Sequence, residues 1–145
     1  MSYTLHVEPR SSYLYITVTG ENSYDTVDRY LSEVRNLCLQ HNCQNVLIVE
    51  NLAGSGLDTF SIFDLVTRHT LQTSPLIRKI AYVDINPDHN QEAMQFAENV
   101  AVNRGVSVQV FSTISAAEDW MSDQENSGSN SAGEVGKQPS VDGQP

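Results

Sequence analysis

Strand-like and helix-like segments alternate along most of this chain, and this order constrains the fold more than any other feature of the sequence. Two strand patterns come first, Tyr3–Val7 and Tyr13–Gly20, and a helix pattern follows after Ser23. From there each strand pattern is followed by a helix pattern, ending near Met121. Parallel strands need crossover connections, so this order predicts an α/β domain with a mostly parallel five-stranded sheet and four packed helices.

The strand patterns show which faces should be buried. Leu14, Ile16 and Val18 alternate with more polar residues, which predicts a strand with one strongly buried face. Val46–Val49 is a continuous apolar run instead. Such a run is typical of a central parallel strand that is covered on both faces, and we expect it in the middle of the sheet.

Capping residues mark the expected helix boundaries. Asp58 should cap a helix over about Thr59–Thr73. Asn86 followed by Pro87 is the signature of a helix start, because proline fits the first helical position. Gly105 should end that helix, since glycine accepts the left-handed conformation that closes many helices.

Residues 122–145 differ from the rest of the chain in composition. Ser122–Pro145 contains no aromatic residue and no apolar period. Such a segment cannot bury enough surface to offset the entropy cost of ordering. We therefore expect one folded domain over residues 1–121 and a disordered acidic tail over residues 122–145.

The charge and the cysteines narrow the functional classes. A net charge of −10 repels phosphate backbones, so nucleic acid is not an expected partner. No run approaches the roughly 20 apolar residues of a membrane span, and the first residues lack a secretion signal, which favours a cytoplasmic protein. Cys38 and Cys43 should be free thiols, and their spacing does not suit zinc. We expect no metal and no cofactor.

The half of the chain from Ile80 to Met121 resembles the C-terminal half of the SpoIIAA-like family, within the STAS fold superfamily. Its motifs are a helix-ending glycine, a strand that ends in phenylalanine, and a tryptophan that docks the last helix. The order of the upstream elements is also compatible, so the resemblance covers about Tyr3–Met121. The stretches that carry it are Ile80-Ala81-Tyr82-Val83, Phe96-Ala97-Glu98-Asn99-Val100-Ala101, Asn103-Arg104-Gly105-Val106-Ser107-Val108-Gln109-Val110-Phe111 and Ala116-Ala117-Glu118-Asp119-Trp120-Met121.

This resemblance implies a small cytoplasmic module that binds or regulates without catalysis. The nearest named relatives of the family are anti-anti-sigma factors and lipid-binding CRAL-TRIO domains. Anti-anti-sigma factors carry a phosphorylatable serine before Gly-Leu, at the entry to the helix after the central strand. Ser55-Gly56-Leu57 falls at this place, where a helix N-terminus would favour a phosphate. The family's Asp and second Ser or Thr are replaced by Ala53 and Gly54, so an ordinary flexible loop is the simpler interpretation.

The helix after this loop is apolar on most of its circumference. Burial between the sheet and neighbouring helices explains such a pattern. The alternative is that Phe60 or Phe63 lines a ligand groove or a partner surface beside Glu50–Leu57. Ligands of open parallel sheets collect at the carboxyl ends of the strands, where this loop should lie. We therefore expect a protein partner or a small apolar ligand to bind through Ser55, Gly56, Leu57, Phe60 and Phe63.

Other chemistries find little support in the sequence. His6, His69 and His89 have no partner that the sequence identifies, and the Gly-x-Ser-x-Gly spacing of hydrolases is absent around Ser55. Asp84 and Asp88 could coordinate a cation, but acids that favour a helix start are the simpler interpretation.

Two alternatives to a binding module stay open. One is an enzyme that acts on a small substrate in the same cleft, which strongly shifted pKa values among Glu50, Asp58, His69 and Asp84 would favour. The other is a structural domain that forms homo-oligomers.

Overall fold

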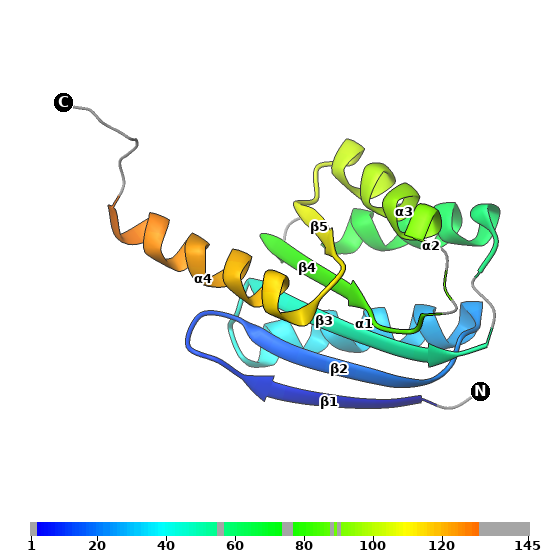
Figure 1. The fold of residues 1–145 in the computed structure, drawn as a ribbon, viewed down its shortest axis with the longest axis horizontal. Helices are drawn as coiled ribbons and strands as arrows, with labels where there is room; N and C mark the ends of the chain where they lie inside the picture. The colour runs from blue at the N-terminus through cyan, green and yellow to red at the C-terminus, as the bar shows by residue number, and fades with distance from the viewer. Residues whose placement is uncertain (1–2, 55–56, 74–76, 88, 90, 131–145) are drawn as a thin grey trace.

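The computed structural model describes residues 3–54, 57–73, 77–87, 89 and 91–130. In this part of the chain, strands and helices follow one another in the predicted order (Figure 1). In chain order the elements are β1 (Tyr3–Pro9), β2 (Leu14–Glu21), α1 (Tyr24–Gln40), β3 (Asn45–Ala53), α2 (Thr59–Thr73), β4 (Lys79–Asp84), α3 (Gln91–Asn103), β5 (Val108–Phe111) and α4 (Ile114–Asn130).

The strands form one five-stranded sheet in the order β1-β2-β3-β4-β5. Strand β1 is antiparallel to β2, and every other neighbouring pair is parallel. The predicted sheet is confirmed, and so is the position of Val46–Val49, because β3 is hydrogen-bonded to parallel strands on both sides.

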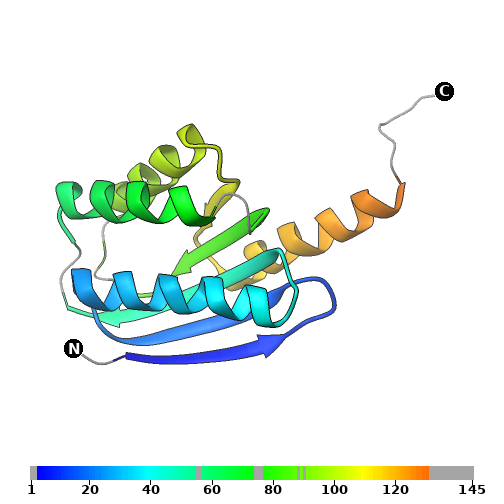
Figure 2. The same ribbon diagram turned by 180° about the vertical axis from the view of Figure 1, so that it is seen from behind.

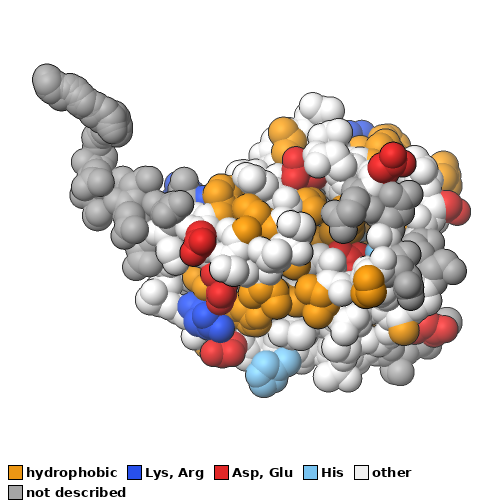
Figure 3. Space-filling model, in the orientation of Figure 1, with side chains coloured by type: hydrophobic (Ala, Val, Ile, Leu, Met, Phe, Trp, Pro, Cys, Tyr) orange, Lys and Arg blue, Asp and Glu red, His pale blue; other side chains and the backbone are white. Residues whose placement is uncertain are grey.

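Helices cover both faces of the sheet. Helices α1, α2 and α3 lie on one face, and α4 lies on the other (Figures 1 and 2). Strand β3 sends Val46 and Ile48 into the core beneath α1 and α2, whereas Leu47 and Val49 join Ala117 of α4. This two-sided packing is the reason for the uninterrupted apolar run. Figure 3 shows hydrophobic side chains gathered over the strands beside α4, where a single helix covers the sheet.

Local signals position most helix ends as expected. The Ser23 side chain accepts a hydrogen bond from the Thr26 amide at 3.1 Å and caps α1. The Asp58 carboxylate accepts one from the Ser61 amide at 2.7 Å and caps α2. Gly105 has a φ of 90° and follows α3, in the left-handed conformation that favours glycine.

The predicted start of α3 at Asn86 and Pro87 is wrong, because the helix begins at Gln91. The Asn86 amide N–H instead donates to the Asp84 carboxylate at 3.0 Å, and the Asn86 side chain donates to the Leu52 carbonyl at 2.7 Å. These bonds hold the chain in a turn against the end of β3 and delay the helix.

Helix α4 is longer than the expected short helix that ends near Met121. It continues to Asn130 and projects past the sheet (Figure 2). A helix that packing has nucleated gains one hydrogen bond for each added residue, so it does not need apolar residues to continue. Residues 131–145 lie outside the described part of the chain, and the division into a domain and a disordered tail stays a prediction.

Candidate functional site

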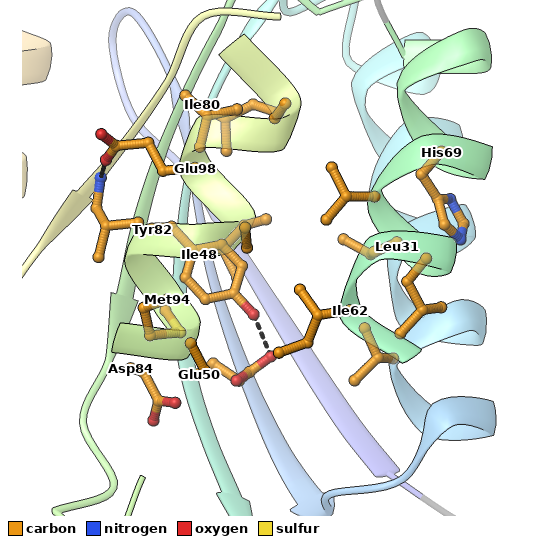
Figure 4. A pocket seen from close by; sticks show the side chains of 18 of the residues that line it. Leu31, Ile48, Glu50, Ile62, His69, Ile80, Tyr82, Asp84, Met94 and Glu98 are labelled. Carbon is orange, nitrogen blue, oxygen red and sulfur yellow. Dashed lines mark hydrogen bonds between the residues drawn. The ribbon is translucent and has the colours of Figure 1, made fainter. Parts of the chain in front are cut away.

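A cavity of about 180 Å³ lies between α2 and α3 on one side and strands β3, β4 and β5 on the other (Figure 4). Helix α2 packs mainly against α3 and α1, so it bridges over this part of the sheet. Most of the wall is apolar. Its apolar lining includes Leu31 of α1, Ile48 of β3, Leu57, Ile62, Leu65 and Val66 in and before α2, Ile80 of β4, and Met94 of α3.

A row of small side chains on α3 explains why the space exists. Ala93, Ala97 and Ala101 follow one another at helical spacing, and all three line the cavity. An alanine side chain ends at Cβ, so this stripe cannot fill the distance between α3 and the opposite wall. Residues of the same helix that face away are larger and more exposed, as Val102 shows with 51% of its surface exposed.

One end of the cavity is polar. Glu50 lies near the end of β3 and Asp84 ends β4, and the two residues are paired in register across the parallel strands. Both carboxylates therefore meet at the carboxyl edge of the sheet, as Figure 4 shows. A third acid on the wall, Glu98 of α3, is held elsewhere, because it accepts a hydrogen bond from the Val110 amide at 2.7 Å.

Two tyrosines hold the buried Glu50 carboxylate. Tyr30 of α1 and Tyr82 of β4 both donate their hydroxyls to the same oxygen, Oε2. The two hydroxyl oxygens lie 2.6 Å apart. Burial raises the pKa of Glu50, although the hydrogen bonds from the tyrosines oppose this change. Burial beside the Glu50 charge raises the pKa of both tyrosines well above the ordinary value, so they remain hydrogen-bond donors.

His89 joins Asp84 at the same end of the cavity. Its Nδ1 lies 2.6 Å from Oδ2 of Asp84, and the side chains are only 5% and 4% exposed. Its Nε2 lies 3.0 Å from the carbonyl oxygen of Gly54, and the amide nitrogens of Asn86 and Asn22 are farther away, at 3.3 and 3.5 Å. Burial alone would lower the pKa of His89, but the hydrogen bond to Asp84 and its charge outweigh burial and raise this pKa.

Glu50, Asp84 and His89 form a group that could hold a metal ion. One ligand atom from each residue lies within 4.8 Å of the other two. The sequence predicted no metal; it raised a cation at Asp84 and Asp88 only as the less simple alternative, and Asp88 lies outside the described residues.

A second buried histidine lies away from this group. Figure 4 shows His69 on α2, remote from Glu50. Its Nε2 lies 2.8 Å from Oδ1 of Asp28, and Arg35 donates to its Nδ1 at 2.6 Å. Burial lowers the pKa of His69, and the charges of Arg35 and Arg68 act in the same direction against the bond to Asp28. The neutral ring fits both contacts, because Nδ1 accepts and Nε2 donates.

The structure separates the residues that the sequence grouped into one site. Leu57 lines the cavity. Phe60 is 78% exposed, and Phe63 is 41% exposed and lies 5.2 Å from the Arg104 guanidinium, so neither is among the lining residues. Ser55 and Gly56 lie outside the described residues, so the phosphorylation site and that part of the binding surface stay predictions.

Sequence reasoning missed the polar partners of the site. Tyr30, Tyr82 and His89 carried no local motif, and His89 depends on a turn that was interpreted as a helix start. One signal was available, because Glu50 and Asp84 each follow the apolar core of a predicted neighbouring strand. Two acids at the carboxyl ends of adjacent parallel strands should lie side by side.

The comparisons with known proteins show the fold. No family model matches the chain, and no curated protein is similar to it in sequence. A solved structure from Shewanella loihica, described as an uncharacterised protein of the DUF3478 family with a SpoIIAA-like fold, is similar with a TM-score of 0.51 and 14% identity. The similarity covers 82% of this chain and 93% of that chain. The expected SpoIIAA-like fold is therefore confirmed. Of the helices in the described part of the chain, none is long and apolar enough to cross a membrane.

Proposed function

We propose that this protein is a non-enzymatic binding module that holds the apolar part of a small ligand in the cavity between α2, α3 and the sheet. The cavity itself is the observation that carries this proposal. An engineered apolar cavity of about 150 Å³ in another protein binds benzene. A volume of about 180 Å³ therefore suits an apolar group of the size of a six-membered ring or a short branched chain.

The arrangement of the walls supports the same function. Binding sites for small molecules are usually concave and apolar, with a few polar groups that orient the ligand. Here the polar groups are Glu50, Tyr82 and His89 at one end, and the rest of the wall is mainly aliphatic. The carboxyl edge of a parallel sheet is also where ligands of such folds collect. We infer a ligand with an apolar body and one hydrogen-bonding group.

The test compares the wild type with a variant whose cavity is smaller. Native mass spectrometry of protein purified from its own host shows whether a small molecule is retained. Ala97→Leu should lose this molecule, because the larger side chain occupies the cavity at the middle of the row of alanines on α3. Val102→Leu adds a carbon on the exposed side of the same helix and should retain the molecule. A ligand that stays bound to Ala97→Leu, or a wild type with none that also gains no thermal stability from apolar test compounds, would contradict the proposal.

A protein partner is the second candidate, because Phe60 at 78% exposure offers a large apolar side chain to solvent. Together with Phe63 it forms an apolar surface at the start of α2. This surface lies outside the cavity, so a partner and a small ligand would bind independently. Phe60→Ala should abolish partner capture and leave the mass of any retained small molecule unchanged.

A further inference from the structure

We propose that Glu50, Asp84 and His89 bind one divalent transition-metal ion at the polar end of the cavity. The proposal does not depend on an apolar ligand, because all three side chains belong to the protein. It rests on the placement of their ligand atoms, on the groups that hold each of these side chains, and on the charge of the cluster.

The three side chains converge from separate elements. Glu50 comes from β3, Asp84 from β4, and His89 from the turn before α3. Their ligand atoms lie within 4.8 Å of one another. Two ligands at about 2.1 Å from a tetrahedral zinc ion lie about 3.4 Å apart, so a separation at the 4.8 Å limit would close by at most about 1.4 Å when the ion binds. A small side-chain rotation provides a movement of this size.

Each of the three side chains is held at one atom and leaves another atom for the ion. Glu50 accepts both tyrosine hydroxyls at Oε2, which leaves Oε1. Asp84 accepts the Asn86 amide at Oδ1 at 3.0 Å, which leaves Oδ2. His89 has Nε2 at 3.0 Å from the Gly54 carbonyl, where an N–H donates, which leaves Nδ1. Metal-binding histidines and carboxylates in proteins are oriented by the same kind of outer hydrogen bond.

The contact between Asp84 and His89 is consistent with two neighbouring ligands on one ion. Oδ2 and Nδ1 lie 2.6 Å apart across a shared proton, and when an ion replaces this proton the two atoms move apart to the separation of about 3.4 Å that neighbouring ligands of a tetrahedral ion keep. His89 then coordinates as a neutral imidazole, which is the form that binds metals.

The charge of the cluster also favours a cation. Two carboxylates are buried side by side, and like charges at such a distance oppose each other. Among the described residues that line the cavity there is no lysine or arginine, and His89 can offset at most one of the two carboxylate charges. A divalent ion with two carboxylates and a neutral imidazole makes a neutral site, which suits a cavity with apolar walls.

The ligand set indicates the class of metal. Imidazole nitrogen together with carboxylate oxygen suits zinc, manganese and iron(II), whereas copper(I) prefers sulfur. Calcium takes six to eight oxygen ligands, which this site does not offer. Three protein ligands leave at least one position of the ion free to face the cavity.

Zinc titration of the untagged full-length protein tests the proposal. After treatment with a chelator, isothermal titration calorimetry with Zn²⁺ should show one equivalent bound, and Mg²⁺ should bind far more weakly. Glu50→Gln, Asp84→Asn and His89→Gln should each lose this binding. Tyr82→Phe removes one hydroxyl that orients Glu50 and should weaken the affinity by about 10- to 100-fold. His69→Gln alters the other buried histidine–aspartate pair and should bind like the wild type.

Each outcome decides the matter. A wild type that binds no Zn²⁺ at millimolar concentration overturns the proposal. Binding that persists in both Asp84→Asn and His89→Gln also overturns it, because the ion then sits at exposed histidines such as His6 or His41. Circular dichroism checks the fold of each variant, and if Asp84→Asn does not fold, His89→Gln decides. Loss of zinc binding with retained apolar ligand, or the reverse, separates this proposal from the proposed function.

Discussion

Filling the cavity should stabilise the protein, and Ala97→Leu is the sharpest perturbation. The substitution adds three carbon atoms at the middle of the alanine stripe, where Ala97 faces the cavity. Burial of about 0.8 kcal/mol per added carbon gives an upper limit of about 2.4 kcal/mol. Ordering the leucine side chain costs about 0.5–1 kcal/mol. The free energy of unfolding should therefore rise by about 1.5 kcal/mol.

Urea unfolding followed by circular dichroism measures this change, with refolded protein so that no small molecule remains bound. Val102→Leu is the matched control, because the same helix presents this side chain to solvent, and its free energy of unfolding should stay within about 0.5 kcal/mol of the wild type. If the space were already filled by neighbouring side chains, Ala97→Leu would instead overpack the site and destabilise the protein by about 1–3 kcal/mol. A loss of stability of that size would refute the description of the cavity as open space.

Three further predictions concern single side chains. Tyr30→Phe removes a hydroxyl that donates to the buried Glu50 carboxylate, and should lower the free energy of unfolding in urea by about 1.5–3 kcal/mol; an unchanged value would mean that Glu50 does not need this donor. Phe60→Ala should change that free energy by less than about 0.5 kcal/mol because the ring is 78% exposed, and a loss of about 3–5 kcal/mol would show that the ring is buried in solution. His69 has a pKa below its ordinary value of 6.5, so below pH 6.5 the unfolded chain binds more protons at this residue than the folded protein does. Its contribution to stability is therefore present above pH 6.5 and is lost as the pH falls; His69→Gln should flatten this part of the pH profile, and an unchanged slope would contradict the assignment.

The sequence was sufficient for the arrangement of the sheet because its signals were local and strong. The run Val46–Val49 needs two covered faces, and alternate side chains of β3 pack in the core with α1 and in the core with α4. Capping by Ser23 and Asp58 depends on amides within three residues, so it could be predicted without knowledge of the fold. Helix caps of this kind form wherever the helix itself forms, whatever the rest of the fold.

The site could be predicted only in part because its contacts join distant segments. Phe60 and Phe63 looked like candidates for the binding surface since they are large and apolar, but the side on which a residue of α2 lies depends on where α1 and α3 pack. The cavity exists because the alanines of α3 are small and because α2 and the sheet do not come close enough to fill the space beside them. The distance between these elements cannot be predicted from the residue pattern of a single helix.

The polar end of the cavity follows from one pairing that the strand order implies. Placing β3 beside β4 brings Glu50 opposite Asp84, and two adjacent carboxylates removed from water are unfavourable without compensation. The chain supplies compensation from three directions, with Tyr30 from α1, Tyr82 from β4 and His89 from the turn before α3. Replacing Glu50 by leucine takes away the acceptor that the buried hydroxyls of Tyr30 and Tyr82 share, and a buried polar group left unsatisfied costs about 1–3 kcal/mol. The double variant Glu50→Leu/Asp84→Asn should therefore have a lower free energy of unfolding whether or not an ion binds. Zinc titration of the folded double variant separates the two roles: we expect it to take up no Zn²⁺, and uptake of one equivalent would assign the two acids to the fold alone.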